Sequence, residues 1–235
     1  MLSKIKFSKI ILLIFFVLMS SGFALLNYRT WRVSKDDPTI WIKPCATLKA
    51  NVWSSNNIED SSDPLKNTAQ PTYDQVVSSV IDDYNNIQSA YIRLAKYPDD
   101  PNNPGTPATG DSTFTIAKGE VRTIDVCFTD PSGVLSGGDA SQKADGNNVV
   151  GCTIRIKEKY KSDLKYFLTV MTHEIGHCLG LDHPMDTTNA IMSYFRESSP
   201  NRLLIDDKMG IIHIYPSDAS AAKEKDSLGL SCAKN

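Results

Sequence analysis

The sequence of 235 residues lacks internal repeats and strong net charge, and it contains only four histidines. Without repeats, and without glycine-aspartate nonapeptides in particular, solenoids and calcium-binding β-helices are excluded. The formal net charge of −2 gives no reason to expect nucleic acid or an acidic membrane surface as a partner. What is present is the composition of an ordinary globular protein, with 41% hydrophobic and 22% charged residues.

Long apolar runs are also scarce, and the prominent one lies at the N-terminus. Residues Ile10 to Met19 follow three lysines and precede the small residues Ser20 to Ala24, which predicts a signal peptide over residues 1–24. The run is short for a membrane span, which needs about 20 residues, so a cleaved signal is favoured over a signal anchor. The sequence therefore predicts a secreted or periplasmic protein without stable membrane association.

Five cysteines follow this segment and would reach an oxidising compartment: Cys45, Cys127, Cys152, Cys178 and Cys232. Two disulfides and one free thiol is the simplest expectation, although spacing does not determine the pairing. Cys127 and Cys152 lie in apolar, strand-like runs that could be neighbours, and Cys178 could be tied to Cys232.

Three of the four histidines lie between His173 and His183. His173 and His177 are four residues apart, so on a helix their imidazoles project from one face and can bind one metal ion. Gly180 is placed to end that helix in the left-handed conformation, and the reversed chain can bring His183 back as a third ligand. Three protein ligands leave one tetrahedral position of a zinc ion open, which is typical of a catalytic site.

Glu174 lies between the first two histidines in sequence, where it can border the metal without binding it. From there it can take a proton from water as a general base. A bare His-Glu-x-x-His pattern also arises by chance on solvated helices. The added glycine and third histidine make a chance match rarer by roughly a thousandfold. The sequence therefore predicts one catalytic Zn²⁺ held by His173, His177 and His183, with Glu174 as the base.

This motif, followed by Ala190 to Tyr194, resembles the metzincin clan of zinc endopeptidases, and within it the serralysin and matrixin groups most closely. The resemblance implies hydrolysis of a peptide or protein substrate. It also implies that Met192 forms the Met-turn beneath the histidines and that Tyr194 approaches the zinc and can donate a hydrogen bond to the oxyanion. The resemblance is specific over residues 165–216, which end in an expected helix at 205–215.

The expected fold is a mixed α/β (α+β) metzincin-like zincin domain over residues 25–235, and we expect a monomer. A twisted, mostly parallel sheet with an antiparallel edge strand and two long helices would form an upper subdomain at about 36–180. The Met-turn and final helix would form a lower subdomain at about 181–235. The resemblance places residues 149–156 at the sheet edge, antiparallel to the substrate, although an ordinary sheet strand fits these residues equally well.

Local patterns predict further elements around the motif. Thr72 to Gln75 has capping-box spacing, which predicts a helix from there to Pro98. Ser162 is the expected N-cap of the zinc helix. Strands are expected at 39–43, 114–117 and 121–128, and loops at 54–70, 98–112 and 130–148. The glycine-aspartate turns of the last loop could bind Ca²⁺ but lack a defined ligand spacing, so plain turns are favoured. With no histidine in that loop, the second zinc site of matrixins is excluded.

Two alternatives to an endopeptidase stay open. One is a zinc-binding pseudoenzyme or peptide-binding module without turnover, which would have no need for Glu174. The other is a hydrolase of cell-wall peptides, which keeps the chemistry and changes the substrate. Latency is open as well. A constitutively active mature enzyme is favoured, but residues 25–38 could form a minimal blocking peptide, in which case Asp36 or Asp37 would coordinate the zinc.

Overall fold

The computed structural model describes residues 29–100, 103–107, 122–129, 137–184, 187–194 and 200–217. The predicted signal peptide at 1–24, the predicted strand at 114–117 and Cys232 lie outside these residues. Within them, no helix combines the length and the apolar character needed to cross a membrane.

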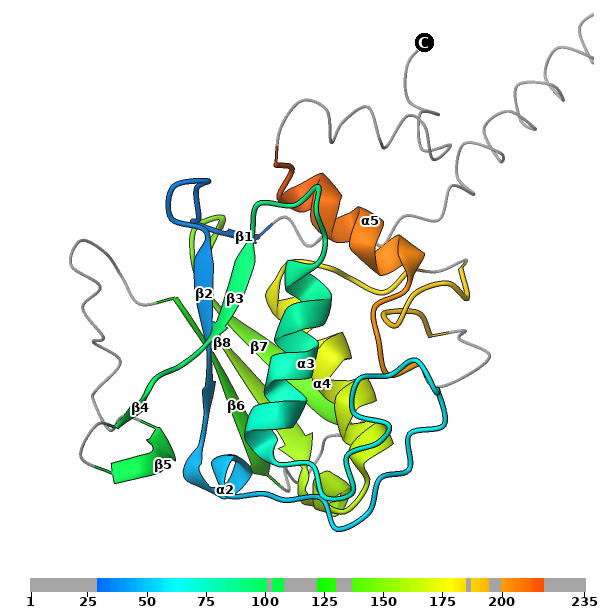
Figure 1. Cartoon of the computed structure of the whole chain (residues 1–235). Coiled ribbons are helices and arrows are strands. Elements are labelled where there is room, and N and C mark those ends of the chain that lie inside the picture. The colour runs from blue at the N-terminus through cyan, green and yellow to red at the C-terminus, as the bar shows by residue number, and fades with distance from the viewer. Residues whose placement is uncertain are drawn as a thin grey trace, which may run out of the picture.

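A six-stranded sheet forms the centre of the domain (Figure 1). Its strands are β1 (Thr30–Trp31), β2 (Thr39–Pro44), β3 (Arg93–Lys96), β6 (Thr123–Thr129), β7 (Gly138–Asp145) and β8 (Asn148–Lys157). Pairing is parallel along the order β1-β8-β6-β2-β3, whereas β7 pairs antiparallel with β8. This confirms the expected mixed α/β domain with a mostly parallel sheet.

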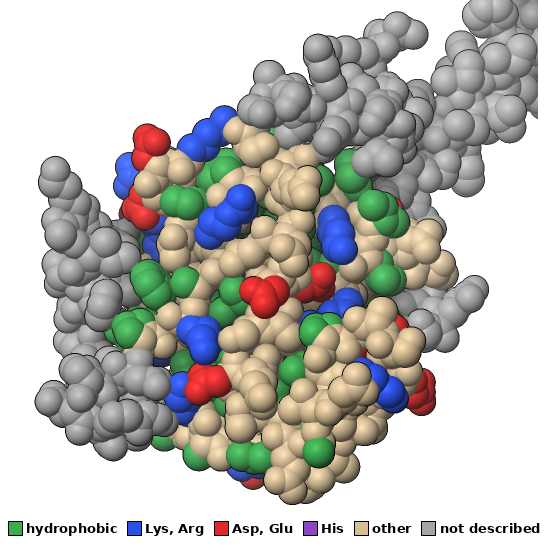
Figure 2. Space-filling model, viewed as in Figure 1, with side chains coloured by type: hydrophobic (Ala, Val, Ile, Leu, Met, Phe, Trp, Pro, Cys, Tyr) green, Lys and Arg blue, Asp and Glu red, His purple; other side chains and the backbone are tan. Residues whose placement is uncertain are grey.

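Two long helices, α3 (Tyr73–Asn85) and α4 (Leu164–Cys178), lie side by side against the sheet (Figure 1). The hydroxyl of Tyr84 on α3 donates to the Thr172 carbonyl of α4 at 2.7 Å and joins them. The shorter helices are α2 (Ala46–Lys49), the 3-10 helix η1 (Glu158–Lys161) and α5 (Ile205–Ile214). On the face seen in Figure 2, acidic and basic side chains are interspersed, in keeping with the small net charge.

Helix α3 begins as predicted but ends earlier. The capping box is present, since the Gln75 N–H donates to Thr72 and the Thr72 N–H donates to the Gln75 side chain. The prediction that the helix continues to Pro98 is wrong, because it ends at Asn85 and the chain then forms β3. The Asn85 amide bonds both the N–H and the C=O of Leu94, at 2.8 and 2.9 Å, so the end of the helix fixes the start of the next strand.

The prediction that residues 130–148 are irregular is wrong for the described part. Strand β7 turns at Gly146, which has a φ of 58°, into β8. Edge strand β7 is thus the antiparallel one, and β8, expected at the edge, lies between β6 and β7. An edge strand that exposes one face to water needs few apolar residues, so the polar run at 138–145 hid it. The expected loop at 98–112 also contains a small sheet, β4 (Asp99–Asp100) with β5 (Asn103–Pro107).

The cysteine pairs are Cys45–Cys127 and Cys152–Cys178, which corrects both suggested pairings. Cys127 and Cys152 do lie on neighbouring strands, but the register places Ile124 opposite Cys152. Cys178 ends α4, which packs on β8, and it therefore meets Cys152.

The N-cap of α4 is Asp163 rather than Ser162, because the Asp163 carboxylate accepts the Tyr166 N–H at 3.0 Å. The apolar stripe of this helix is buried in the core, and its members are Leu164, Leu168, Met171, Ile175 and Leu179.

Candidate metal centre

Three histidine side chains converge at the C-terminal end of α4. His173 and His177 project from the helix, and His183 returns after a turn at Gly180, whose φ of 101° is the predicted left-handed conformation. The Nε2 atoms of the three rings lie 3.1 Å apart in each pair. The sequence therefore predicted this grouping correctly.

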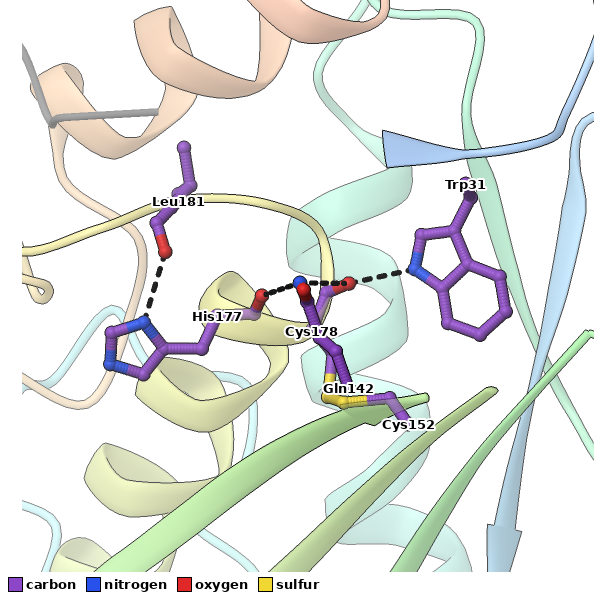
Figure 3. Close-up of a disulfide and its surroundings, with 6 residues drawn as sticks. All are labelled: Trp31, Gln142, Cys152, His177, Cys178 and Leu181. Atoms are coloured by element: carbon purple, nitrogen blue, oxygen red, sulfur yellow. Dashed lines mark hydrogen bonds between the residues drawn. A yellow bond between two sulfur atoms is a disulfide. The ribbon is translucent and has the colours of Figure 1, made fainter. Parts of the chain in front are cut away.

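Main-chain carbonyls fix the tautomer of two of these rings. The Nδ1 atom of His173 lies 2.9 Å from the Ile191 oxygen, and that of His177 lies 2.9 Å from the Leu181 oxygen (Figure 3). A carbonyl oxygen only accepts, so each Nδ1 carries the hydrogen and each Nε2 presents a lone pair. Lone pairs this close repel one another unless they share a cation.

Zinc fits this donor set. Tetrahedral Zn²⁺ with Zn–N bonds of about 2.0–2.1 Å sets its nitrogen ligands roughly 3.3–3.4 Å apart, close to the 3.1 Å seen here. Hydrogen bonds from Nδ1 to backbone carbonyls are also the usual way in which zinc-binding imidazoles are oriented. Among the described residues, the histidine triad is the one group of side chains suited to hold a metal. Asp37 instead pairs with Arg122 at 2.7 Å, so the structure gives no support to a blocking role for it.

Glu174 lies beside the triad and is not part of the metal-holding group. It is buried, and it lines an open pocket of about 430 Å³ together with the three histidines. Burial raises the pKa of Glu174 to about 8, and the negative charge of Asp139 adds to the rise. A divalent cation at the triad would lower the pKa of Glu174. The carboxyl group is thus placed for proton exchange near neutral pH.

Edge strand β7 comes very close to Glu174. A Cβ atom at Gly138 would lie 2.6 Å from Val170 and 3.5 Å from the Glu174 side chain. Only a residue without a side chain lets the strand approach α4 in this way. The glycines that the sequence associated with turns or calcium therefore bring the sheet edge to the pocket.

Tyr194 stands at the mouth of the pocket with its side chain 66% exposed. Its ring lies against that of His183, with centroids 3.9 Å apart. This is the neighbourhood that the resemblance implied for the tyrosine. Met192 is buried beneath the site, and its sulfur faces Gly176 of α4.

Gly176→Ala is expected to destabilise the protein, because the added Cβ would lie 2.5 Å from the Met192 sulfur. Overpacking of this kind costs about 1–3 kcal/mol of unfolding free energy. Urea unfolding would measure the loss. The matched control is Gly151→Ala, where the nearest atom to the new Cβ is that of Lys143 at 3.8 Å. Equal unfolding midpoints for the two variants would contradict the close packing of the methionine.

A buried aspartate holds the turn that carries Met192. The Asp207 carboxylate accepts the N–H groups of Ile191, Met192 and Leu204 at 2.7, 3.2 and 2.9 Å. Burial raises the pKa of Asp207 to about 6, although these hydrogen bonds work against the rise. Because the Ile191 carbonyl accepts from His173, Asp207 indirectly orients a metal ligand. From sequence alone, an aspartate in the first turn of α5 indicates only stabilisation of the helix N-terminus.

Side chains from two strands bind the last carbonyls of α4 (Figure 3). The amide nitrogen of Gln142 on β7 donates to the His177 oxygen at 2.7 Å, and the indole of Trp31 on β1 donates to the Cys178 oxygen at 2.7 Å. Helix C-terminal carbonyls have no partner within the helix. These two contacts therefore fix the turn that carries His177, and no sequence pattern indicated either of them.

The same turn has two more attachments. The Tyr215 hydroxyl, just beyond α5, donates to the Leu179 oxygen at 2.9 Å. The Cys152–Cys178 disulfide joins the end of α4 to β8 (Figure 3). The helix end that carries His177 is thus held by a covalent bond and by side-chain hydrogen bonds from three separate parts of the chain.

Replacing Cys152 and Cys178 together by alanine is expected to cost about 3 kcal/mol of stability, given loop-closure entropy over a separation of 26 residues. Because Cys178 follows His177, we also expect zinc affinity to fall by about tenfold, as for other groups that orient ligands. Unfolding and chelator competition would measure the two effects. Replacing Cys45 and Cys127 is the control, which should lower stability without changing zinc affinity. Equal zinc affinities in both variants would contradict a positioning role.

The mostly parallel sheet, the histidine triad at the end of α4 and the buried methionine turn are together consistent with a zincin of the metzincin type. Residues 104–216 match the family model described as Matrixin. The chain is also 41% identical over 56 residues to Matrix metalloproteinase-B of Caenorhabditis elegans, a match that covers 23% of this chain and 11% of that protein. The chain thus spans about a tenth of that relative.

These matches support a metzincin family of the matrixin-like type for this chain. A matrixin domain indicates a zinc metallopeptidase, and it indicates proteins or peptides as the class of substrate.

Proposed function

We propose that this protein is an exported zinc-dependent endopeptidase. The observation that carries the proposal is the convergence of three Nε2 atoms 3.1 Å apart beside a buried carboxyl group, Glu174, that is not one of the ligands. A zinc ion in this site would supply a polarised water and a Lewis acid for the scissile carbonyl. The match to the matrixin family supports the same chemistry.

The chain's own residues supply the proton transfers. Glu174 takes a proton from the attacking water and later delivers it to the nitrogen of the leaving amine. The Tyr194 hydroxyl donates a hydrogen bond to the oxygen that gains negative charge. The Nδ1–H groups of His173 and His177 donate to backbone carbonyls, so their Nε2 lone pairs would stay available to a metal ion.

Strand β7 offers the substrate an edge to pair with. The Lys157 N–H donates to the Gly137 oxygen at 3.0 Å, and the register runs on through Ala140 opposite Ile154. Because hydrogen-bonded pairs alternate along an antiparallel ladder, the N–H and C=O of Ala140 turn away from β8, toward the pocket that Ala140 lines. A peptide laid antiparallel to β7 would bind there as an added strand, gaining affinity without demanding particular side chains.

Export is part of the proposal. Residues 1–24 have the layout of a signal peptide, and two disulfides suit a secreted or periplasmic protein. N-terminal sequencing of the exported protein would test this, with Leu25 as the expected first residue.

Digestion of an unstructured protein such as casein separates the candidate functions. An endopeptidase cuts casein at many sites. A pseudoenzyme would hold zinc and bind peptides without cutting them. A cell-wall hydrolase would release cross-linked wall peptides and leave casein intact, which would overturn the proposed substrate class.

A further inference from the structure

A second pocket, of about 370 Å³, lies next to the first along the same sheet edge. The two share Ala140 and His177, and the second continues along β7 through Ser141 and Gln142. Figure 3 shows one of its lining residues, Gln142, which reaches the backbone of α4 at His177. A peptide that pairs with β7 in the first pocket therefore passes over the second.

The charge of the second pocket comes from Arg29 and Asp182. The Asp182 carboxylate accepts the main-chain N–H of His183 at 2.7 Å and lies 3.6 Å from Nδ1 of the His183 ring. It therefore interacts with His183. Within the described part of the chain, Arg29 has no ion-pair partner. Its guanidinium group thus brings a positive charge outside any ion pair, and several hydrogen-bond donors, to a lining that includes the polar side chains of Ser141 and Gln142.

The direction of the strand decides which part of a substrate lies there. Strand β7 runs from Gly138, beside Glu174, to Gln142, beside the second pocket. A substrate antiparallel to β7 runs the other way, so the residues that precede the cut bond lie over Arg29. Resting on the proposed function, we propose that the second pocket is a subsite for an acidic side chain on the N-terminal side of the cut bond, with Arg29 as its specificity-determining residue.

The test compares peptides that carry Glu, Gln or Lys at each position before the cut bond. Exposed ion pairs are weak, so kcat/KM for the best Glu position should exceed that for Gln by roughly threefold to tenfold at low salt. The preference should shrink as salt is added. Arg29→Met, which keeps the length of the side chain, should abolish it. Arg29→Glu should reverse it in favour of Lys.

Peptide binding to a Glu174→Gln background, measured by fluorescence anisotropy, separates this inference from the proposed function. Cleavage with no charge preference, or with one that Arg29→Glu leaves unchanged, overturns the subsite and keeps the peptidase. An acidic preference that follows the cut bond instead of preceding it also overturns the subsite. Absence of cleavage together with Arg29-dependent binding of the Glu peptides keeps the subsite and overturns the peptidase. Absence of both overturns both.

Discussion

Glu174→Gln is expected to lower the kcat of peptide hydrolysis by about a thousandfold, within the range that general bases contribute. The amide fills the same buried place beside the triad but cannot accept the proton of the attacking water. Because Glu174 is not in the metal-holding group, zinc content should not change. Steady-state kinetics on a fluorogenic peptide would measure the loss, and metal analysis would check the zinc.

The matched control is Glu59→Gln, since Glu59 is an exposed carboxylate paired with Lys165 at the surface. It should retain the full rate. A near-normal rate for Glu174→Gln would show that another group takes the proton, and the proposed mechanism would be wrong.

Removal of zinc by a chelator is expected to abolish hydrolysis and to lower stability. Without a cation between them, the lone pairs of three imidazole nitrogens 3.1 Å apart repel one another. A ligand present at a thousandfold above its Kd stabilises the folded state by about 4 kcal/mol, so thermal unfolding should shift clearly. Returning zinc should restore both activity and stability.

Two histidine variants make this prediction specific. His183→Ala should lose most of its zinc and behave like the chelated protein. His213→Ala, at an exposed position on α5, should bind zinc as the native chain does. A chelated protein that unfolds at an unchanged temperature and still cuts peptides would contradict the metal site.

The convergence of the three histidines could be predicted from the sequence because their spacing is local. His173, His177 and His183 lie within one helix and the turn that follows, and the conformation of Gly180 is read from its type and place. The groups that hold the site are remote in sequence. Trp31 lies 147 residues from Cys178, and Gln142 lies 35 residues from His177. Contacts of this range depend on how the sheet and helices pack, which no local pattern encodes.

Much of the fold could be predicted for similar reasons. The errors of that prediction have physical causes. Regular apolar spacing predicted β2 and the start of α3. Strand β7 was missed because its sequence is polar. Strand β3 was read as helix because Tyr91 and Leu94, three residues apart, continue a helical spacing. The disulfides were mispaired because strand register, rather than distance in sequence, decides which cysteines meet.

The measurement that tests the account most directly is zinc content together with cleavage of a random peptide library, for the native chain and for Glu174→Gln. We predict one zinc ion per chain in both proteins, with cuts made by the native chain alone. Native protein that is folded but holds no zinc, or equal cutting by the two proteins, would contradict the account.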